Sequence, residues 1–223
     1  MRPVDKGKSP NVYKNWKDAR NDLAIRLGWY CSYCEMPVSN MLEVEHIVPR
    51  NHGGAPLSWE NFLISCKYCN TIKSDNNTSR DGYLWPDRDN TDLAFNYSEK
   101  NIIEPEQENG FIEKAANATI KLLGLDRRPG GTNEPTDADT RWILRLQAWL
   151  IAKLSLENWK KLPDQNMADQ IAKTAFGTGF YSVWKKVFEN EPQVIDAFIK
   201  VFPNTYNEKD EHLKRKIRPG ALI

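Results

Sequence analysis

Hydrophobic residues recur every three or four positions in several stretches of this chain, a spacing that predicts amphipathic helices. Over residues 12–27, Trp16, Leu23 and Leu27 fall on one helical face, and Gly28 supplies a stop. Beyond residue 111 the same spacing predicts helices over residues 112–123, 139–156, 165–175, 180–190 and 193–202. We therefore expect the C-terminal half of the chain to be helical.

A different pattern lies between these helical stretches. Residues 41–48 form a short run rich in branched apolar side chains that ends at Pro49, which predicts a β-strand. Phe62–Ser65 predicts a second strand, and the residues after Cys69 predict the start of a helix. The order strand, loop, strand and helix predicts a small ββα unit.

All cysteines of the chain occur in two C-x-x-C pairs that flank this unit: Cys31, Cys34, Cys66 and Cys69. One tight turn can present both sulfurs of a pair to a single ion, so two such turns predict a tetrahedral zinc site. Four thiolates leave no open coordination position, so this Zn²⁺ is expected to be structural. The alternatives are a redox pair or four ordinary buried thiols.

Composition sets the compartment and the mode of binding that we expect. The 223 residues are 40% hydrophobic, contain no run of about 20 apolar residues, and begin without the apolar segment of a signal peptide. We therefore expect a soluble, cytoplasmic protein without membrane contact. The 31 basic residues are balanced by 30 acidic ones, which argues against a free-standing protein that holds nucleic acid tightly.

Three segments within the cysteine frame resemble the HNH endonucleases: VEHIVPR, the WEN tripeptide and CNTIKSDN after the second cysteine pair. The resemblance covers about residues 29–76, and Asn70 stands at the third position of the family's name. It implies an α+β, mostly helical fold, in which a zinc-stapled ββα-metal core carries an N-terminal helix and a C-terminal helical region. We expect an HNH nuclease domain at residues 1–100 and a helical domain at residues 101–223 that binds a partner.

The resemblance also implies the roles of the central residues. His46 would be the general base, Glu45 and Asn70 would bind a catalytic Mg²⁺ or Mn²⁺, and Asn61 would hold the loop that orients His46. These residue types suit the chemistry, because an imidazole accepts protons near neutral pH and carboxylate or amide oxygens are ligands for Mg²⁺. Each residue also has a simpler interpretation: Asn61 as a turn residue before the strand, Asn70 as a helix N-cap.

Two basic residues near this constellation, Arg50 and Lys73, are candidates to contact the phosphate backbone. The alternative for both is a solvated surface charge. Neighbouring residues in a strand point to opposite faces, so Glu45 and His46 need a bulge or a strand end to act together.

Further segments, including MRPVDKG, LWPDRDNTDLAFNY and GFYSVWKKVF, are similar to the HNH nuclease subunits (PtuB) of the Septu anti-phage systems. That similarity implies a DNA-cleaving effector that works with an ABC/SMC-type ATPase (PtuA-like). The alternatives are a zinc-ribbon subunit that binds nucleic acid or protein without cutting, and an interaction subunit with a vestigial site. Because the chain is nearly neutral, we expect it to bind DNA weakly by itself and to depend on a partner.

Overall fold

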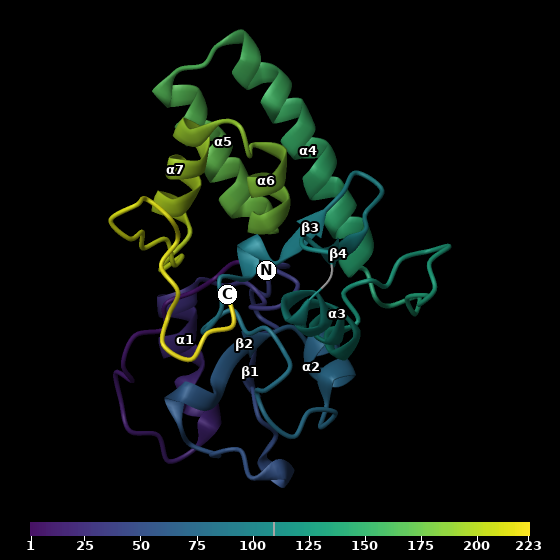
Figure 1. Ribbon diagram of the computed structural model, residues 1–223, viewed down its shortest axis with the longest axis vertical. Coiled ribbons are helices and arrows are strands. Elements are labelled where there is room, and N and C mark those ends of the chain that lie inside the picture. The colour runs from purple at the N-terminus through teal and green to yellow at the C-terminus, as the bar shows by residue number, and fades with distance from the viewer. Residues whose placement is uncertain (109) are drawn as a thin grey trace.

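The protein consists of a small ββα unit joined to a bundle of helices (Figure 1). The computed structural model describes residues 1–108 and 110–223, and within them it contains seven α-helices and two small antiparallel sheets. The predicted α+β fold class is confirmed. No helix in these two ranges is both long enough and apolar enough to cross a membrane.

The first sheet pairs β1 (Glu43–His46) with β2 (Phe62–Ser65), and His46 lies opposite Phe62. Strand β2 is as predicted, whereas β1 is shorter than the predicted residues 41–48. At its end, the Ile47 N–H still donates to the Asn61 carbonyl at 2.8 Å, but the Val48 N–H donates to the Asn61 side chain. The strand therefore ends where a side chain replaces the backbone of β2 as the partner.

Helix α2 (Lys67–Lys73) follows β2 and begins earlier than predicted. Its N-cap is Cys66, whose Sγ accepts a hydrogen bond from the Cys69 N–H at 3.4 Å. Asn70 consequently lies in the middle of the helix, so its interpretation as an N-cap is wrong. A sulfur that caps the helix keeps the second cysteine pair on one turn and turns Asn70 toward the sheet.

The N-terminal helix is also shorter than residues 12–27. Asn15 caps a 3-10 turn, η1 (Trp16–Ala19), because its side chain accepts from the Lys17 N–H, and α1 (Arg20–Leu27) then runs to Gly28. Gly28 has a φ of 80°, which ends the helix. Residues 12–15 remain non-helical because the cap, not the hydrophobic spacing, sets the start.

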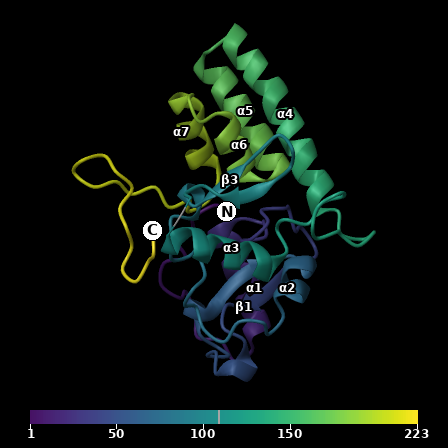
Figure 2. The same cartoon turned by 45° about the vertical axis from the view of Figure 1, so that its right-hand side comes forward.

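The C-terminal helices occur where the periodicity predicts them, with bounds that differ by a few residues: α3 (Phe111–Leu123), α4 (Arg141–Lys161), α5 (Gln165–Thr178), α6 (Tyr181–Val187) and α7 (Pro192–Val201). Helices α4 to α7 form the bundle, whereas α3 lies beside α2 (Figure 2). Leu150, in α4, is 60% exposed.

The segment before α3 forms a hairpin of β3 (Phe95–Tyr97) and β4 (Ile103–Pro105). Buried apolar residues gather in two clusters, one around the ββα unit with α1 and α3, the other within α4 to α7. Glu35 connects them, because its carboxylate accepts from the Ser182 N–H at 2.9 Å and from its hydroxyl at 2.6 Å. The boundary between domains at residue 100 stays a prediction.

Candidate metal centre and catalytic cavity

The four cysteine sulfurs converge on one buried point. The Sγ atoms of Cys31, Cys34, Cys66 and Cys69 all lie within 4.8 Å of one another, and no disulfide joins them. The Cys34 and Cys66 sulfurs are 3.7 Å apart. Zn–S bonds of about 2.3 Å in a tetrahedron place sulfurs about 3.8 Å apart, so the cluster has the size of a structural zinc site.

Charge supports the same interpretation. Burial raises the pKa of the Cys34 and Cys69 thiols, so these two sulfurs become thiolates only when a cation binds them. Arg141, from the start of α4, donates to the Cys69 Sγ at 3.1 Å and to the Leu123 carbonyl at 3.0 Å. Sequence reasoning missed Arg141, because nothing in a helical stretch 72 residues away indicates a contact with a cysteine.

Apart from the cysteine cluster, a solvent-open cavity of about 520 Å³ lies between β1, α2 and the loop after β1. His46, Glu45, Asn70 and Arg50 all line it, together with Asp75. The structure therefore brings most of the residues expected at the catalytic site to one wall. The pairing of β1 with β2 is regular at both Glu45 and His46, so no bulge is needed for this.

His46 is partly buried and held in one orientation. Its Nε2 lies 3.0 Å from the Pro56 carbonyl oxygen, and its ring packs edge-on against Phe62 with centroids 5.2 Å apart. A carbonyl only accepts, so in the neutral ring Nε2 carries the hydrogen and Nδ1 keeps a lone pair. Burial lowers the pKa of His46 below its ordinary value of 6.5, and the charges of Arg50 and Lys73 lower it further. The ring is thus a neutral proton acceptor at pH 7.

Asn61 holds the loop that carries Pro56. It ends the short 3-10 turn η3 (Trp59–Asn61), and its Oδ1 accepts from the Val48 N–H at 2.8 Å. Its Nδ2 donates to the Val48 carbonyl at 2.9 Å and to the Ala55 carbonyl at 3.2 Å. The buried Asn61 amide therefore ties Val48, at the start of the loop after β1, to Ala55. Ala55 lies one residue before Pro56, whose carbonyl orients His46.

Glu45 and Lys73 form a buried ion pair. Glu45 is 3% exposed, and its Oε1 lies 2.6 Å from the Lys73 Nζ while its Oε2 accepts from the Tyr33 hydroxyl. Lys73 has no exposed surface, and its ammonium also donates to the His46 carbonyl at 2.9 Å. The expectation that Lys73 contacts phosphate is therefore wrong for this structure, because its ammonium faces β1 instead of solvent.

Glu43 is a second acidic residue that the expected site did not include. The Asn70 Nδ2 donates to the Glu43 Oε2, so the amide expected at the metal is paired with a carboxylate two residues before Glu45. The E-x-E spacing was the available signal, since residues two apart in a strand share a face.

These features occur in the order of a ββα-metal unit: a cysteine turn, β1 with His46, Asn61, β2, and α2 with the second cysteine turn and Asn70. Residues 31–76 match the family model of the HNH endonucleases. We call them the HNH unit; they make up about a fifth of the chain and include both cysteine pairs and His46. No curated protein matches the chain.

Two further residues line the cavity: Arg50, within the HNH unit, and Trp16, which precedes it in the chain. Arg50 is exposed, in the 3-10 turn η2 (Arg50–His52), and its Cζ lies 4.4 Å from the centroid of the Trp16 ring. Trp16 also packs against the His46 ring, with centroids 5.9 Å apart. The sequence placed Trp16 on the apolar face of the N-terminal helix. It does pack against the core around the ββα unit, and it also lines the cavity, which the sequence did not indicate.

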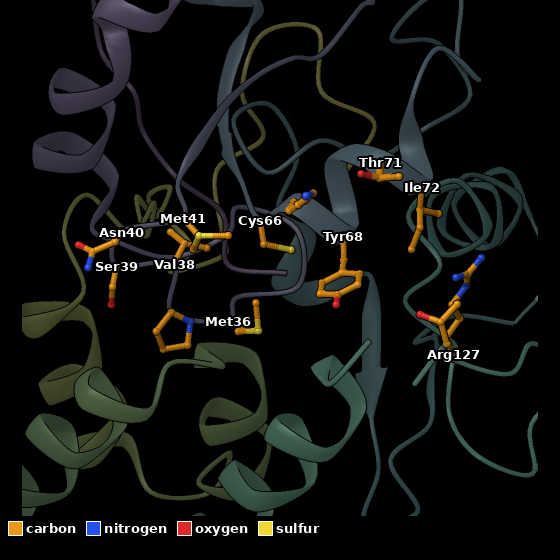
Figure 3. Close-up of a pocket in the computed structure, with 13 residues that line it drawn as sticks. Met36, Val38, Ser39, Asn40, Met41, Cys66, Tyr68, Thr71, Ile72 and Arg127 are labelled. Atoms are coloured by element: carbon orange, nitrogen blue, oxygen red, sulfur yellow. The ribbon is translucent and has the colours of Figure 1, made fainter. Parts of the chain in front are cut away.

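A larger cavity lies elsewhere, between the HNH unit and residues 127 and 136 (Figure 3). It has a volume of about 800 Å³ and lies between the segment after the first cysteine pair and the outer side of α2, with Met36, Val38, Tyr68 and Arg127 in its wall. Its lining includes no carboxylate and no histidine. We therefore assign the chemistry of the HNH unit to the smaller cavity around His46.

Proposed function

We propose that this protein is a metal-dependent HNH endonuclease that hydrolyses phosphodiester bonds of DNA. The observation that carries the proposal is the geometry of His46 within the HNH unit. Its Nε2 is tied to the Pro56 carbonyl, its Nδ1 is left to accept a proton, and the ring lines an open cavity beside Asn70. A neutral imidazole held in this way is suited to remove a proton from an attacking water.

Glu45 and Asn70 would hold the catalytic Mg²⁺ or Mn²⁺, with Glu43 next to Asn70. Carboxylate and amide oxygens suit a hard cation, and the Asn70 Oδ1 is not consumed by the bond that its Nδ2 makes. Both Glu45 oxygens are bonded to Lys73 and Tyr33, so Glu45 would have to release or share one of these partners to bind the ion. When bound, the ion would stabilise negative charge on the phosphate and on the leaving oxygen. Lys73 and Tyr33 fix the Glu45 carboxylate and so limit how far it can turn.

The remaining residues of the cavity position the reacting groups. Asn61 keeps the loop after β1 closed, so the Pro56 carbonyl stays within hydrogen-bond distance of His46. Arg50, exposed at the mouth, would bind a phosphate oxygen. The Cys31, Cys34, Cys66 and Cys69 site would contribute stability, since a structural Zn²⁺ supplies folding free energy and no reaction step.

We also propose that the protein is a cytoplasmic effector in anti-phage defence, with an ABC/SMC-type ATPase as its partner. The similarity of its segments outside the HNH unit to Septu nuclease subunits supports this, as does the balance of 31 basic and 30 acidic residues. An apolar face on α4 is a candidate contact for such a partner, because Ile143, Leu150 and Leu154 are 38%, 60% and 60% exposed. The helical domain at residues 101–223 would then carry the partner interface.

A plasmid-cleavage assay tests the nuclease proposal, with the chain alone and with the ATPase. We expect nicking or cutting that requires added Mg²⁺ or Mn²⁺ and that His46→Ala abolishes. His52→Ala is the matched control, because His52 lies in the same loop and its Nε2 is 2.9 Å from the Asp75 carbonyl instead of facing Pro56. Metal dependence should be tested by omitting the ion, since a chelator would also remove the zinc.

Two results would overturn the proposal. If His46→Ala cuts like the wild type, the assigned base is wrong. If the wild-type chain cuts no DNA with either ion, alone or with the ATPase, the zinc-ribbon alternative without catalysis is favoured.

A further inference from the structure

Trp16, which lines the catalytic cavity, contacts two cations: Arg50, which also lines the cavity, and its neighbour in sequence, Lys17. The Arg50 Cζ lies 4.4 Å and the Lys17 Nζ 5.5 Å from the centroid of the Trp16 ring. Both distances are within the range of cation–π attraction, which is about 6 Å. The same indole packs on the ring of His46, and Arg50 and His46 both line the cavity, so Trp16 connects both cations to the proposed general base.

Neither cation has another partner in the described parts of the chain. Arg50 and Lys17 are both exposed, and within residues 1–108 and 110–223 their side chains form no hydrogen bond and no ion pair. Lys73, by contrast, is consumed by its ion pair with Glu45. Trp16 is therefore the group that orders these two side chains, while their N–H donors stay available.

A nearly neutral chain that cuts DNA needs ordered cations at the bond to be cut, since it has no general basic surface to hold the substrate. A guanidinium presents several N–H donors in a planar fork and an ammonium presents three, and both match phosphate oxygens. We propose that Trp16 is a positioning residue that holds Arg50 and Lys17 against DNA phosphates on either side of the bond next to His46. This rests on the proposed function, because it names how the same cavity grips its substrate.

The position of Trp16 explains why it acts through the cations. Its ring is partly buried and Arg50 lies over it, so the ring is occupied by a guanidinium and is not a free platform for a base. Replacement of the indole would leave both cations in place but without a fixed direction. The variant should therefore bind DNA more weakly and with a smaller salt dependence.

The test is the affinity of the full-length protein for a labelled duplex of about 20 base pairs, measured by fluorescence anisotropy at several salt concentrations without divalent ions. Cleavage is then not required, so the outcome is separate from that of the nuclease assay. We expect Trp16→Leu to weaken binding roughly two- to fivefold, the range of an exposed cation–π contact. The slope of log affinity against log salt should become smaller by about 0.9 for each phosphate that a cation no longer neutralises.

A mutant cycle distinguishes positioning from a general structural effect. Trp16→Leu should weaken binding in the wild-type background but leave it unchanged in Arg50→Gln/Lys17→Gln, and Trp16→Phe should restore most of the affinity. Trp29→Leu is the matched control, because Trp29 is 47% exposed and is not among the residues that line the cavity.

The inference is overturned if Trp16→Leu weakens binding equally in both backgrounds, if its salt slope equals that of the wild type, or if the wild-type chain binds no duplex at low salt. Binding that follows the cycle in a protein that cuts no DNA would support the grip by Trp16 and refute the nuclease proposal.

Discussion

Asn61→Ala should loosen the loop that orients His46. Asn61 is 8% exposed, and its amide forms three hydrogen bonds to backbone groups, at 2.8 and 2.9 Å to Val48 and at 3.2 Å to Ala55. A hydrogen bond of this kind contributes about 1 kcal/mol, so the removal of all three lowers the free energy of unfolding by about 3 kcal/mol. The partly buried Val48 N–H is then left without its acceptor in the protein.

This destabilisation predicts a measurable shift in melting temperature. A chain of 223 residues has an unfolding entropy of about 0.47 kcal/mol/K at about 2.1 cal/mol/K per residue, so about 3 kcal/mol lowers Tm by about 6 °C. Thermal unfolding followed by circular dichroism measures the shift. Asn76→Ala is the control, because the Asn76 side chain is exposed and makes a single hydrogen bond, at 3.1 Å to the Ile72 carbonyl.

Asn61→Asp tests the direction of the bonds. Its carboxylate can still accept from the Val48 N–H, but the second oxygen would face the Val48 and Ala55 carbonyls, which repel it. We therefore expect Asn61→Asp to destabilise at least as much as Asn61→Ala. Melting temperatures of both variants within about 1 °C of the wild type would refute the assignment of Asn61 as the clamp of this loop.

Three other predictions concern the same unit. Gly54→Ala should open the loop and lower the free energy of unfolding by about 2 kcal/mol or more, because an added Cβ would lie 1.8 Å from the Val48 carbonyl oxygen. Gly177→Ala should stabilise the protein slightly, because Gly177 is in a helix and an added Cβ would meet no atom within 4 Å. Urea unfolding compares the two variants. Cys66→Ser should lower the zinc content and reduce the free energy of unfolding by several kcal/mol, since structural zinc contributes of order 10 kcal/mol. If the variant retains one zinc per chain and its Tm is unchanged, the four cysteines do not form a structural zinc site. The cleavage rate should be constant from about pH 7 to about pH 8 and fall only below about pH 6.5. The reason is that burial lowers the pKa of His46, and the base is inactive when it is protonated. A rate that reaches half its maximum above about pH 7 would contradict this.

The parts of the fold that were predictable depend on contacts close in sequence. Strand β2 and helix α3 follow from short apolar patterns and from Gly124, which has a φ of 56° as the cap of α3. The two C-x-x-C turns likewise need only local geometry to present their sulfurs. The start of α2 was misplaced because a cysteine sulfur serves as its cap, a role that the sequence pattern alone does not indicate.

The sequence by itself determined that the four cysteines cluster and the order of the ββα unit that contains His46, because spacing and residue chemistry carry that information. The tertiary structure decided which polar groups are available. It turned Lys73 inward to neutralise the buried Glu45, paired Asn70 with Glu43, and placed Trp16 between the core and the cavity, in contact with Arg50. These outcomes depend on burial and on partners far apart in the chain, and a buried charge must find a partner wherever the fold places one.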